Sequence, residues 1–385
     1  MAQIVKCPNC TASLYFDAAS GKVQCEYCGA SFNVDELMSS ATEADEKKLE
    51  DLASDKEQVT EEIVNEVTYE EEANDEEFKE EIDESVELNE NEHQEFVCNN
   101  CGAHVIADRS TSATFCVFCG SPQVIQSRIE DKFKPRYIIP FKYTKEQAIN
   151  GFLKWCKGGR FAPFGFVSSE NINKITGIYV PFWLFDQEVH SDIHAESKHV
   201  KSTTTGNKET ITTSTYDIKY LKKFKFSRVP LDGSSKLDDM LMEAIEPFNY
   251  EELKDFNPMY LAGYFAERYD LVPKDLTERM NKRSKEYVQQ EFNEWTTSYG
   301  SVTSKTDNSV YLEPTAKYAL LPVWFLHYKY LSKDYYFCMN GQTGEVAGIL
   351  PNSRLKTTLI FFVLLAIFAV IARIILGSII GGFVG

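Results

Sequence analysis

The sequence lacks the signatures of several common protein classes. Its N-terminus, MAQIVKCPNC, has no apolar core of the kind found in a secretory signal peptide, so we expect the folded part to stay in the cytosol. No GxxxxGK[ST] phosphate-binding loop is present, because neither Gly21-Lys22 nor Gly233-Ser-Ser-Lys236 fits that pattern. No Ser/His/Asp grouping, catalytic carboxylate pair or open metal site can be read from residue spacing. These absences predict that the protein is not an enzyme.

A basic domain is also missing. The net charge is −18, but residues 43–95 hold 24 acidic and 4 basic residues, a net charge of −20, so the rest of the chain carries about +2. Nucleic-acid binding depends on clustered Lys and Arg side chains that neutralise phosphates. Residues 1–34 hold two basic and two acidic residues, and residues 96–127 hold one of each. We therefore expect protein partners and regard nucleic-acid binding, in replication or transcription, as the alternative.

Eight of the ten cysteines form two copies of one pattern, each a CxxC pair, fourteen residues and a second CxxC pair. Every cysteine of the second copy lies 91 residues after its counterpart. In a reducing cytosol, paired CxxC spacing indicates metal binding rather than disulfides, and four thiolates suit tetrahedral zinc. Redox-active dithiols and unliganded thiols are the alternatives. We predict two Zn²⁺ per chain, bound by Cys7, Cys10, Cys25 and Cys28, and by Cys98, Cys101, Cys116 and Cys119.

The fourteen-residue spacers carry short apolar runs, at residues 13–16 and 104–107, with turn residues after them. Two small β-hairpins that grip one ion, a zinc ribbon, fit this pattern. Glycine after the second cysteine of a CxxC pair favours the tight turn, and three of the four pairs have it. Thr11 replaces glycine in the first pair.

These signals divide the chain into five parts. We predict zinc ribbon 1 in residues 1–35, an acidic spacer in 36–95, zinc ribbon 2 in 96–127, an α+β body in 133–352 and a C-terminal transmembrane anchor in 357–385. The spacer has few, widely spaced apolar residues, and its acidic side chains repel one another. Both features predict a solvated, partly disordered segment. The alternative is an acidic bait for a basic partner.

The body mixes helix and strand patterns. A capping box at Thr144 and Gln147 predicts a helix that carries Cys156 on its apolar face. Asn340-Gly341 predicts a hairpin turn. The expected strands of the body cover residues 137–141, 178–200, 210–226, 318–330 and 335–339. The remaining expected helices cover residues 235–248, 258–269 and 274–295.

Four further features of the body can be interpreted from the sequence, and two of them leave an alternative open. The row His190, Asp192 and His194 is typical of a solvated strand face, with a metal site as the alternative. The basic cluster Arg279–Lys285 (Arg279, Lys282, Arg283 and Lys285) indicates a solvated helix face, with the acidic spacer or anionic lipid heads as alternative ligands. Cys156 and Cys338 are expected to be packed thiols. Val180-Pro-Phe-Trp183 and Leu321-Pro-Val-Trp324 resemble each other, which indicates a duplicated unit.

The C-terminal stretch has no polar side chain from Leu359 to Ala372. A helix of about twenty apolar residues spans a bilayer core, so we predict a single-pass anchor. Arg354 and Lys356 flank it as expected on a cytoplasmic side. Gly377, Gly381 and Gly385 follow Arg373 at intervals of four, which predicts packing against a second transmembrane helix. Arg373 either snorkels to the headgroups or pairs with an acceptor on that helix.

Several pieces together resemble a known bacterial family. They are Cys98 to Cys119, FKPRYIIPF at 133–141, ITGIYVPFWLFD at 175–186 and MNGQTG at 339–344. The chain resembles the TFIIB-type zinc-ribbon membrane proteins, which are sometimes labelled primosomal or DNA-helicase-like. Relatives with a C-terminal anchor are encoded beside SPFH-domain and phage-shock membrane-stress proteins. The resemblance therefore implies a cytosolic scaffold or adaptor that recruits protein partners to the cytoplasmic membrane in a membrane-stress response.

Overall fold

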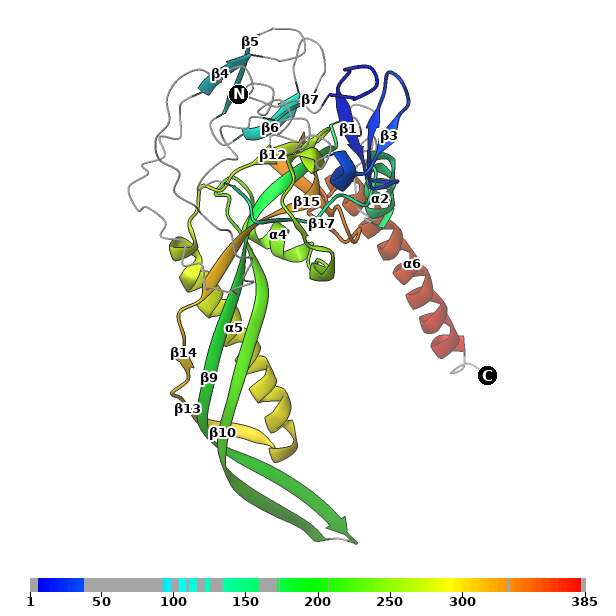
Figure 1. The fold of residues 1–385 in the computed structure, drawn as a ribbon. Helices are drawn as coiled ribbons and strands as arrows, with labels where there is room; N and C mark the ends of the chain where they lie inside the picture. Colours follow the sequence, from blue (N-terminus) through cyan, green and yellow to red (C-terminus); the bar gives the residue numbers. More distant parts are fainter. Residues whose placement is uncertain are drawn as a thin grey trace, which may run out of the picture. The chain divides into compact units, whose positions relative to one another are not determined.

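The protein is described by a computed structural model that covers residues 6–37, 93–97, 104–108, 111–115, 122–124, 134–158, 172, 174–206, 208–330 and 333–381. The fold mixes sheets with a few helices, as the sequence predicts (Figure 1). The chain forms two compact units. One comprises Met1–Lys134 with Asn257–Gly263, and the other comprises Pro135–Phe256 with Tyr264–Gly385. We call them the N-terminal unit and the body, and we call Asn257–Gly263 the strap.

The N-terminal unit is built from short antiparallel hairpins. A three-stranded sheet joins β1 (Leu14–Asp17), β2 (Lys22–Cys25) and β3 (Ser31–Phe32). Two further strand pairs follow, β4 (His93–Val97) with β5 (His104–Asp108) and β6 (Thr111–Phe115) with β7 (Pro122–Val124). Most of the acidic spacer and all four cysteines of the predicted second zinc ribbon lie outside the described residues.

The body is arranged around one long strand, β9 (Thr176–Thr205), which pairs with β10 (Lys208–Asp232) along nearly its whole length. The other strands are β8 (Tyr137–Ile138), β11 (Lys254–Asp255), β12 (Phe265–Glu267), β13 (Ser301–Asp307), β14 (Val310–Tyr311), β15 (Thr315–Tyr330), β16 (Lys333–Asn340) and β17 (Val346–Gly348). The helices are α2 (Lys145–Gly158), α4 (Asp239–Ala244), α5 (Pro273–Thr296) and α6 (Arg354–Gly381), with 3₁₀ turns η3 (Tyr250–Glu252), η4 (Pro258–Leu261) and η5 (Thr297–Tyr299). The strands expected at residues 178–200, 210–226, 318–330 and 335–339 are confirmed, and so is the Asn-Gly hairpin turn between β16 and β17.

Two of the predicted body helices form as their sequences indicate. At the start of α2, the backbone N–H of Gln147 donates to Oγ1 of Thr144, and the N–H of Thr144 donates back to Oε1 of Gln147. This reciprocal pair is the predicted capping box. The buried face of α5 includes Val288 and Phe292, which pack on the inner face of the β9–β10 hairpin. That packing stabilises the projecting part of the β9–β10 hairpin with α5, which we call the arm and which lies below the rest of the body in Figure 1.

Two other predicted helices are corrected by the structure. Residues 258–269 form only the 3₁₀ turn η4 and the strand β12, because Gly263 adopts a positive φ of 94° between them and breaks the helical path. Residues 235–248 form only the six-residue helix α4, which is capped by the Asp238 side chain. The sequence places Leu237, Met240, Leu241, Ala244, Ile245 and Phe248 on one apolar helix face. In the structure, Ile245 and Phe248 are buried and Leu237 and Leu241 pack against the core, but Met240 and Ala244 are exposed and Met242 is buried instead.

The two similar Pro-containing stretches pair with each other. In the antiparallel ladder of β9 and β15, Val180 lies opposite Leu321, its counterpart in the predicted repeat. Each long strand also has a short parallel neighbour that precedes a helix: β8 lies beside β15 and precedes α2, and β12 lies beside β9 and precedes α5. This arrangement is a local two-fold symmetry, in which β8–α2–β9–β10 corresponds to β12–α5–β15–β16.

Hydrogen bonds repeat across this symmetry. The N–H of Gly233, after β10, donates to Pro181 O, and the N–H of Gly341, after β16, donates to Pro322 O, both at 2.8 Å. The indole of Trp183 donates to the carbonyl of Leu271, just before α5, at 2.8 Å. The indole of Trp324 donates at 2.9 Å to the carbonyl of Tyr143, just before α2. These matched contacts support the duplication that the sequence indicates.

The C-terminal helix α6 is apolar over most of its length. Ser353 starts it by accepting the N–H of Lys356 on its Oγ at 3.3 Å. Within α6, the stretch Lys356–Arg373 has a mean hydropathy of 2.1 and no buried residues. Its length and composition make it a candidate membrane span.

Candidate metal centre

Two matching knuckles hold the N-terminal cysteines. In the first, the N–H of Thr11 donates to Cys7 O and the N–H of Cys7 donates to Ala12 O. In the second, the N–H of Gly29 donates to Cys25 O and the N–H of Cys25 donates to Ala30 O. All four distances lie between 2.8 and 2.9 Å. The same backbone turn is therefore built twice, once with threonine and once with glycine in its left-handed position.

Thr11 adopts φ of 61° and Gly29 adopts φ of 71°. Glycine takes this conformation freely, whereas a β-branched residue meets a steric cost there. The Thr11 hydroxyl donates to the carbonyl of Cys10 at 2.6 Å, which partly compensates for that cost. The departure from glycine at position 11 therefore leaves the turn unchanged but strained.

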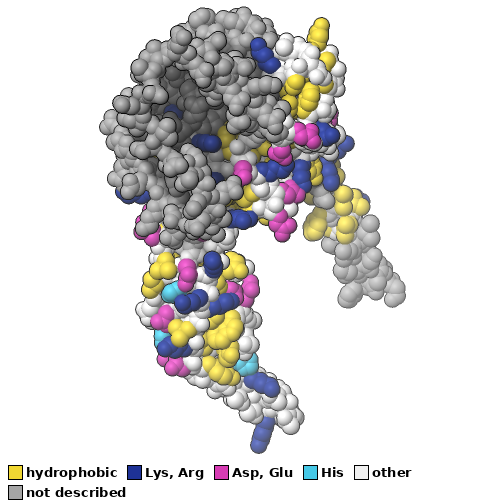
Figure 2. Space-filling view, in the orientation of Figure 1, with side chains coloured by type: hydrophobic (Ala, Val, Ile, Leu, Met, Phe, Trp, Pro, Cys, Tyr) yellow, Lys and Arg dark blue, Asp and Glu magenta, His cyan; other side chains and the backbone are white. Residues whose placement is uncertain are grey.

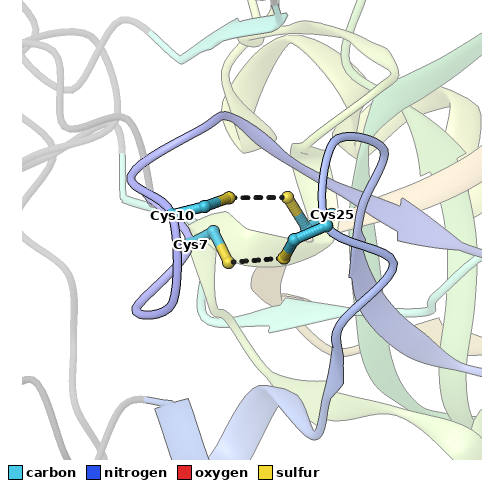
Figure 3. Close-up of side chains that lie close together, drawn as sticks. Cys7, Cys10 and Cys25 are labelled. Carbon is cyan, nitrogen blue, oxygen red and sulfur yellow. Dashed lines mark hydrogen bonds between the residues drawn. The ribbon is translucent and has the colours of Figure 1, made fainter.

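The four sulfur atoms converge on one point (Figure 3). Cys7 Sγ lies 3.6 Å from Cys28 Sγ, and Cys10 Sγ lies 3.5 Å from Cys25 Sγ. All four sulfurs lie within 4.8 Å of one another. A tetrahedral ion with metal–sulfur bonds of about 2.3 Å places its ligands about 3.8 Å apart, whereas a disulfide needs about 2 Å. The arrangement fits a single four-thiolate metal ion and excludes preformed disulfides among these residues.

Backbone donors prepare the sulfurs for negative charge. The N–H of Cys28 lowers the pKa of the Cys25 thiol to about 7, with further help from the Cys10 side chain and the N–H of Tyr27. The N–H of Ala12 acts in the same direction on Cys10, but burial and the three neighbouring thiols raise the pKa of Cys10 to about 12. Four thiols this close cannot all ionise without a cation among them, because like charges repel at short range. A metal ion supplies that cation and deprotonates its ligands.

A polar turn supports the hairpin that carries Cys25. Asp17, at the end of β1, accepts hydrogen bonds from the backbone N–H groups of Ala19 and Ser20 and from Nε2 of Gln24, at 2.8 to 3.2 Å. Gly21 completes the turn with φ of 66°. Cys25 lies at the far end of β2, opposite Leu14 in the ladder. The turn therefore fixes the register that places Cys25 beside the first knuckle.

The strap packs on the opposite part of β1. The N–H of Phe16 donates to Ala262 O at 2.8 Å, and the ring of Phe16 meets the ring of Tyr260 edge-on with centroids 5.2 Å apart. Tyr260 and Leu261 are almost fully buried. Sequence reasoning missed this role because residues 258–269 read as a helix of the body. The bracketing residues Pro258 and Gly263 were the available signal.

The other candidate sites of the sequence do not assemble a metal centre among the described residues. The N-terminal four-cysteine cluster is the one such group in that part of the chain. His190 pairs with Glu188 at 2.6 Å and His194 pairs with Asp192 at 3.0 Å on the exposed face of β9. Histidines lie among basic and acidic side chains on the arm in Figure 2. The solvated strand face is thus what the structure shows for this row.

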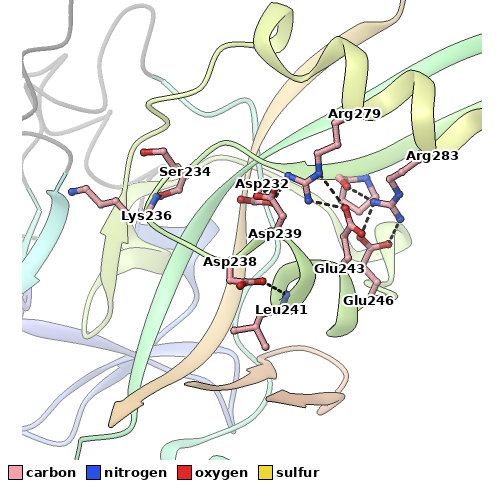
Figure 4. Close-up of polar contacts among 12 residues, drawn as sticks. Asp232, Ser234, Lys236, Asp238, Asp239, Leu241, Glu243, Glu246, Arg279 and Arg283 are labelled. Carbon is pink, nitrogen blue, oxygen red and sulfur yellow. Dashed lines mark hydrogen bonds and ion pairs between the residues drawn. The ribbon is translucent and has the colours of Figure 1, made fainter. Parts of the chain in front are cut away.

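The basic cluster on α5 differs from its expected solvated face. Nη1 of Arg279 contacts Asp232 at 2.9 Å and Asp239 at 3.0 Å, and Nη2 contacts Glu243 at 2.8 Å (Figure 4). Arg283 forms a two-pronged pair with Glu246 at 2.9 and 3.0 Å. Both arginines form ion pairs with acidic residues of α4 and its flanking segments, because the chain folds back over α5 after β10. Lys282 and Lys285 line an open surface groove along α5.

Asp232 is the least expected member of this network. Its side chain is fully buried, and its Oδ2 atom has no hydrogen-bond partner within the described structure. Burial raises the pKa of Asp232 to about 6, although Arg279 acts in the opposite direction. Asn340 occupies the corresponding turn position in the other half of the body, where its Nδ2 donates to Ile245 O at 2.9 Å. The Asp-Gly and Asn-Gly pairs were visible in the sequence, but their equivalence was not.

The two cysteines outside the CxxC pairs are packed thiols, as predicted. Cys156 lies on the buried face of α2, and Cys338 lies within β16 in the body core. Burial raises the pKa of each thiol to about 12. Both are therefore protonated at neutral pH and unreactive.

Comparison with known proteins identifies one family relationship. The chain is 36% identical over 351 residues to YdjG of Bacillus subtilis (strain 168), and the match covers 91% of each chain. The chain belongs to the YdjG family. YdjG is itself described as uncharacterized, so this relationship shows the family, and the function has to be inferred from the site. No family model matches the chain, and no solved structure matches it.

Proposed function

We propose that this protein is a membrane-anchored zinc-ribbon scaffold, which recruits cytosolic protein partners to the cytoplasmic membrane. The observation that carries the proposal is the convergence of Cys7, Cys10, Cys25 and Cys28 in a chain that also has a candidate membrane span. The four-thiolate set has no free position for a substrate, and closed sites of this kind are structural. Zinc is the metal that fits four cysteine ligands in a small hairpin module.

The second ribbon, with Cys98, Cys101, Cys116 and Cys119, completes the proposed architecture. Its support is the repeated spacing in the sequence, since these cysteines lie outside the described residues. Two ribbons would give two stable surfaces for partners, because each bound zinc stabilises its module by roughly 10 kcal/mol. The described part of the first module, residues 6–37, holds two lysines and four acidic residues, a composition that favours protein partners over nucleic acid.

The anchor defines where the scaffold acts. We place α6 across the cytoplasmic membrane as a single span with the body in the cytosol, supported by its apolar stretch and by Arg354 and Lys356 before it. Gly377, Gly381 and Gly385 would pack against a second span. The family resemblance proposes partners of the SPFH-domain or phage-shock type and a role in membrane stress.

The test of this proposal compares full-length variants purified from membranes. Zinc content and co-purified proteins are measured for wild type, Cys25→Ser and Cys101→Ser, with Cys156→Ser as the matched control outside the metal sites. We expect each ribbon variant to lose one zinc and a subset of partners, while the control loses neither. Partners that are retained in both ribbon variants would refute the scaffold role of the ribbons.

The same samples distinguish the alternative function. A nucleic-acid-binding protein would retard labelled DNA or RNA in a gel, and the retardation would weaken steeply as salt increases. We expect no salt-sensitive retardation at micromolar protein. A zinc-dependent shift in wild type that disappears in Cys25→Ser would overturn the scaffold assignment.

A further inference from the structure

The end of the β9–β10 hairpin projects without support from other elements. On the β9 side, β13 accompanies the hairpin only as far as the Ser301–Lys198 pair. On the α5 side, the last ring contact joins Tyr216 to Tyr299 of η5. Beyond these points, seven residue pairs, from His199–Ser214 to Thr205–Lys208, form a two-stranded ribbon about 23 Å long. Figure 1 shows the ribbon running past the end of α5.

An isolated two-stranded ribbon is marginal in water, because ordering its backbone is not offset by apolar burial. All but one of these fourteen side chains are exposed, and Val200 and Ile211 are more than 60% exposed. The described residues supply no third strand on the free edge of β10. A further strand would satisfy the edge backbone groups and bury part of this surface.

The free edge of β10 changes character along its length. Residues 219–228 contain five basic residues, which is the usual protection of an edge strand against pairing. Thr210–Tyr216, with the sequence TITTSTY, has no charge, no proline and no bulge. Its β-branched residues favour strand pairing. The edge is thus open to pairing over seven residues and protected beyond them.

We propose that Thr210–Tyr216 is the uncharged part of a dimerisation strand, in which Glu209–Lys219 pairs antiparallel with the same segment of a second copy of this chain. A two-fold register centred on Ser214 places Glu209 of each copy opposite Lys219 of the other, and it brings no like charges face to face. The same register places Thr212 opposite Tyr216, an aromatic–β-branched pair that stabilises antiparallel strands. The charges at both ends of the uncharged segment therefore suit a second copy.

The membrane contributes to this association. Eleven paired residues of each chain, in a single pair of strands, bury less surface than a stable soluble dimer usually requires. Two chains anchored in one membrane meet at a much higher effective concentration than two free chains. In this respect the inference rests on the proposed anchor, and the dimer is expected to form in membranes more readily than in dilute detergent.

Position-specific cross-linking tests the strand pairing. Ser214→Cys is introduced into the full-length chain, and membranes are treated with a short thiol cross-linker. Ser202→Cys, on β9 opposite Ile211, is the matched control, and wild type gives the background of the native cysteines. We expect Ser214→Cys alone to give a strong new band at twice the 43.9 kDa chain mass, with position 214 joined to itself in the linked peptide.

Charge placement then tests the register. In the Ser214→Cys chain, Thr212→Lys with Tyr216→Lys puts lysines opposite each other, and we expect the linked band to fall at least tenfold. Thr212→Lys with Tyr216→Glu puts opposite charges together and should restore it. Adding Gly377→Leu and Gly381→Leu should leave the link in place, which separates strand pairing from helix packing in the membrane.

Three outcomes would overturn the inference: no band above the wild-type background, a link to a different protein, or a band that the paired lysines leave unchanged. Carbonate extraction of the same membranes checks the anchor separately. If the chain is extracted, the proposed membrane function fails, and cross-linking at high protein concentration still decides the strand pairing.

Discussion

Replacement of Asp232 by asparagine is expected to stabilise the body above neutral pH. Burial raises the pKa of Asp232 from 3.8 to about 6, so the ionised carboxylate is disfavoured in the folded state. A shift of about two units corresponds to roughly 3 kcal/mol. Because the folded pKa is raised, this stability is fully present below about pH 4 and is lost as the pH rises through about 6. Asp232→Asn removes the group that titrates.

The charge of Arg279 stays paired in this variant. Its guanidinium also contacts Asp239 and Glu243, so the substitution leaves no isolated buried cation, which is the usual reason that breaking a buried pair is costly. Asparagine already occupies the corresponding turn at position 340. We therefore expect a gain of about 2 kcal/mol in the unfolding free energy near pH 7.5, and about 1 kcal/mol less near pH 5.

Urea unfolding followed by tryptophan fluorescence measures this gain. All four tryptophans (Trp155, Trp183, Trp295 and Trp324) lie in the body, so the signal excludes the cysteine modules. Asp239→Asn is the control, because Asp239 also contacts Arg279 but is 57% exposed. It removes only the smaller contribution of the Asp239 charge to the raised pKa of Asp232, so its pH-dependent gain should be well below that of Asp232→Asn. Destabilisation by Asp232→Asn that is equal at both pH values would refute the reasoning and show a net favourable ion pair.

Three further predictions follow from the structure and the sequence. Thr11→Gly should relieve the positive φ of the first knuckle and stabilise it by about 1 kcal/mol, seen as slower zinc transfer to a chromophoric chelator, and faster transfer would contradict the strain. Deletion of residues 43–92, which leaves strand β4 intact, should not change the tryptophan-monitored unfolding midpoint because this acidic segment has little apolar surface to bury, and a large drop would reveal a docked element. Gly377→Leu with Gly381→Leu should reduce cross-linking between membrane helices, and unchanged linking would show that this glycine stripe faces lipid.

Sequence patterns predicted most of the elements that depend only on residues close together in the chain. The CxxC spacing anticipated the convergence of Cys7, Cys10, Cys25 and Cys28, because each pair closes its own turn. The capping box at Thr144 and the apolar face of α5 predicted two helices for the same reason.

Elements decided by distant contacts were not predicted. The strap is drawn into the N-terminal unit by Phe16, more than two hundred residues away, and no local signal encodes that contact. Arg279 and Arg283 appear solvated in a helical projection, but Asp232, Glu243 and Glu246 reach them through the fold. The residues that form ion pairs with a charged side chain in the folded protein cannot be predicted from residue spacing along one helix.

Zinc analysis of the full-length chain, purified from membranes without added metal, tests the assignment of two zinc ribbons. We expect two zinc ions per chain and an X-ray absorption spectrum of four sulfur ligands at about 2.3 Å. Cys25→Ser should remove one ion and Cys101→Ser the other. A chain with fewer than two zinc ions, or with nitrogen or oxygen atoms bound to the metal, would contradict this assignment.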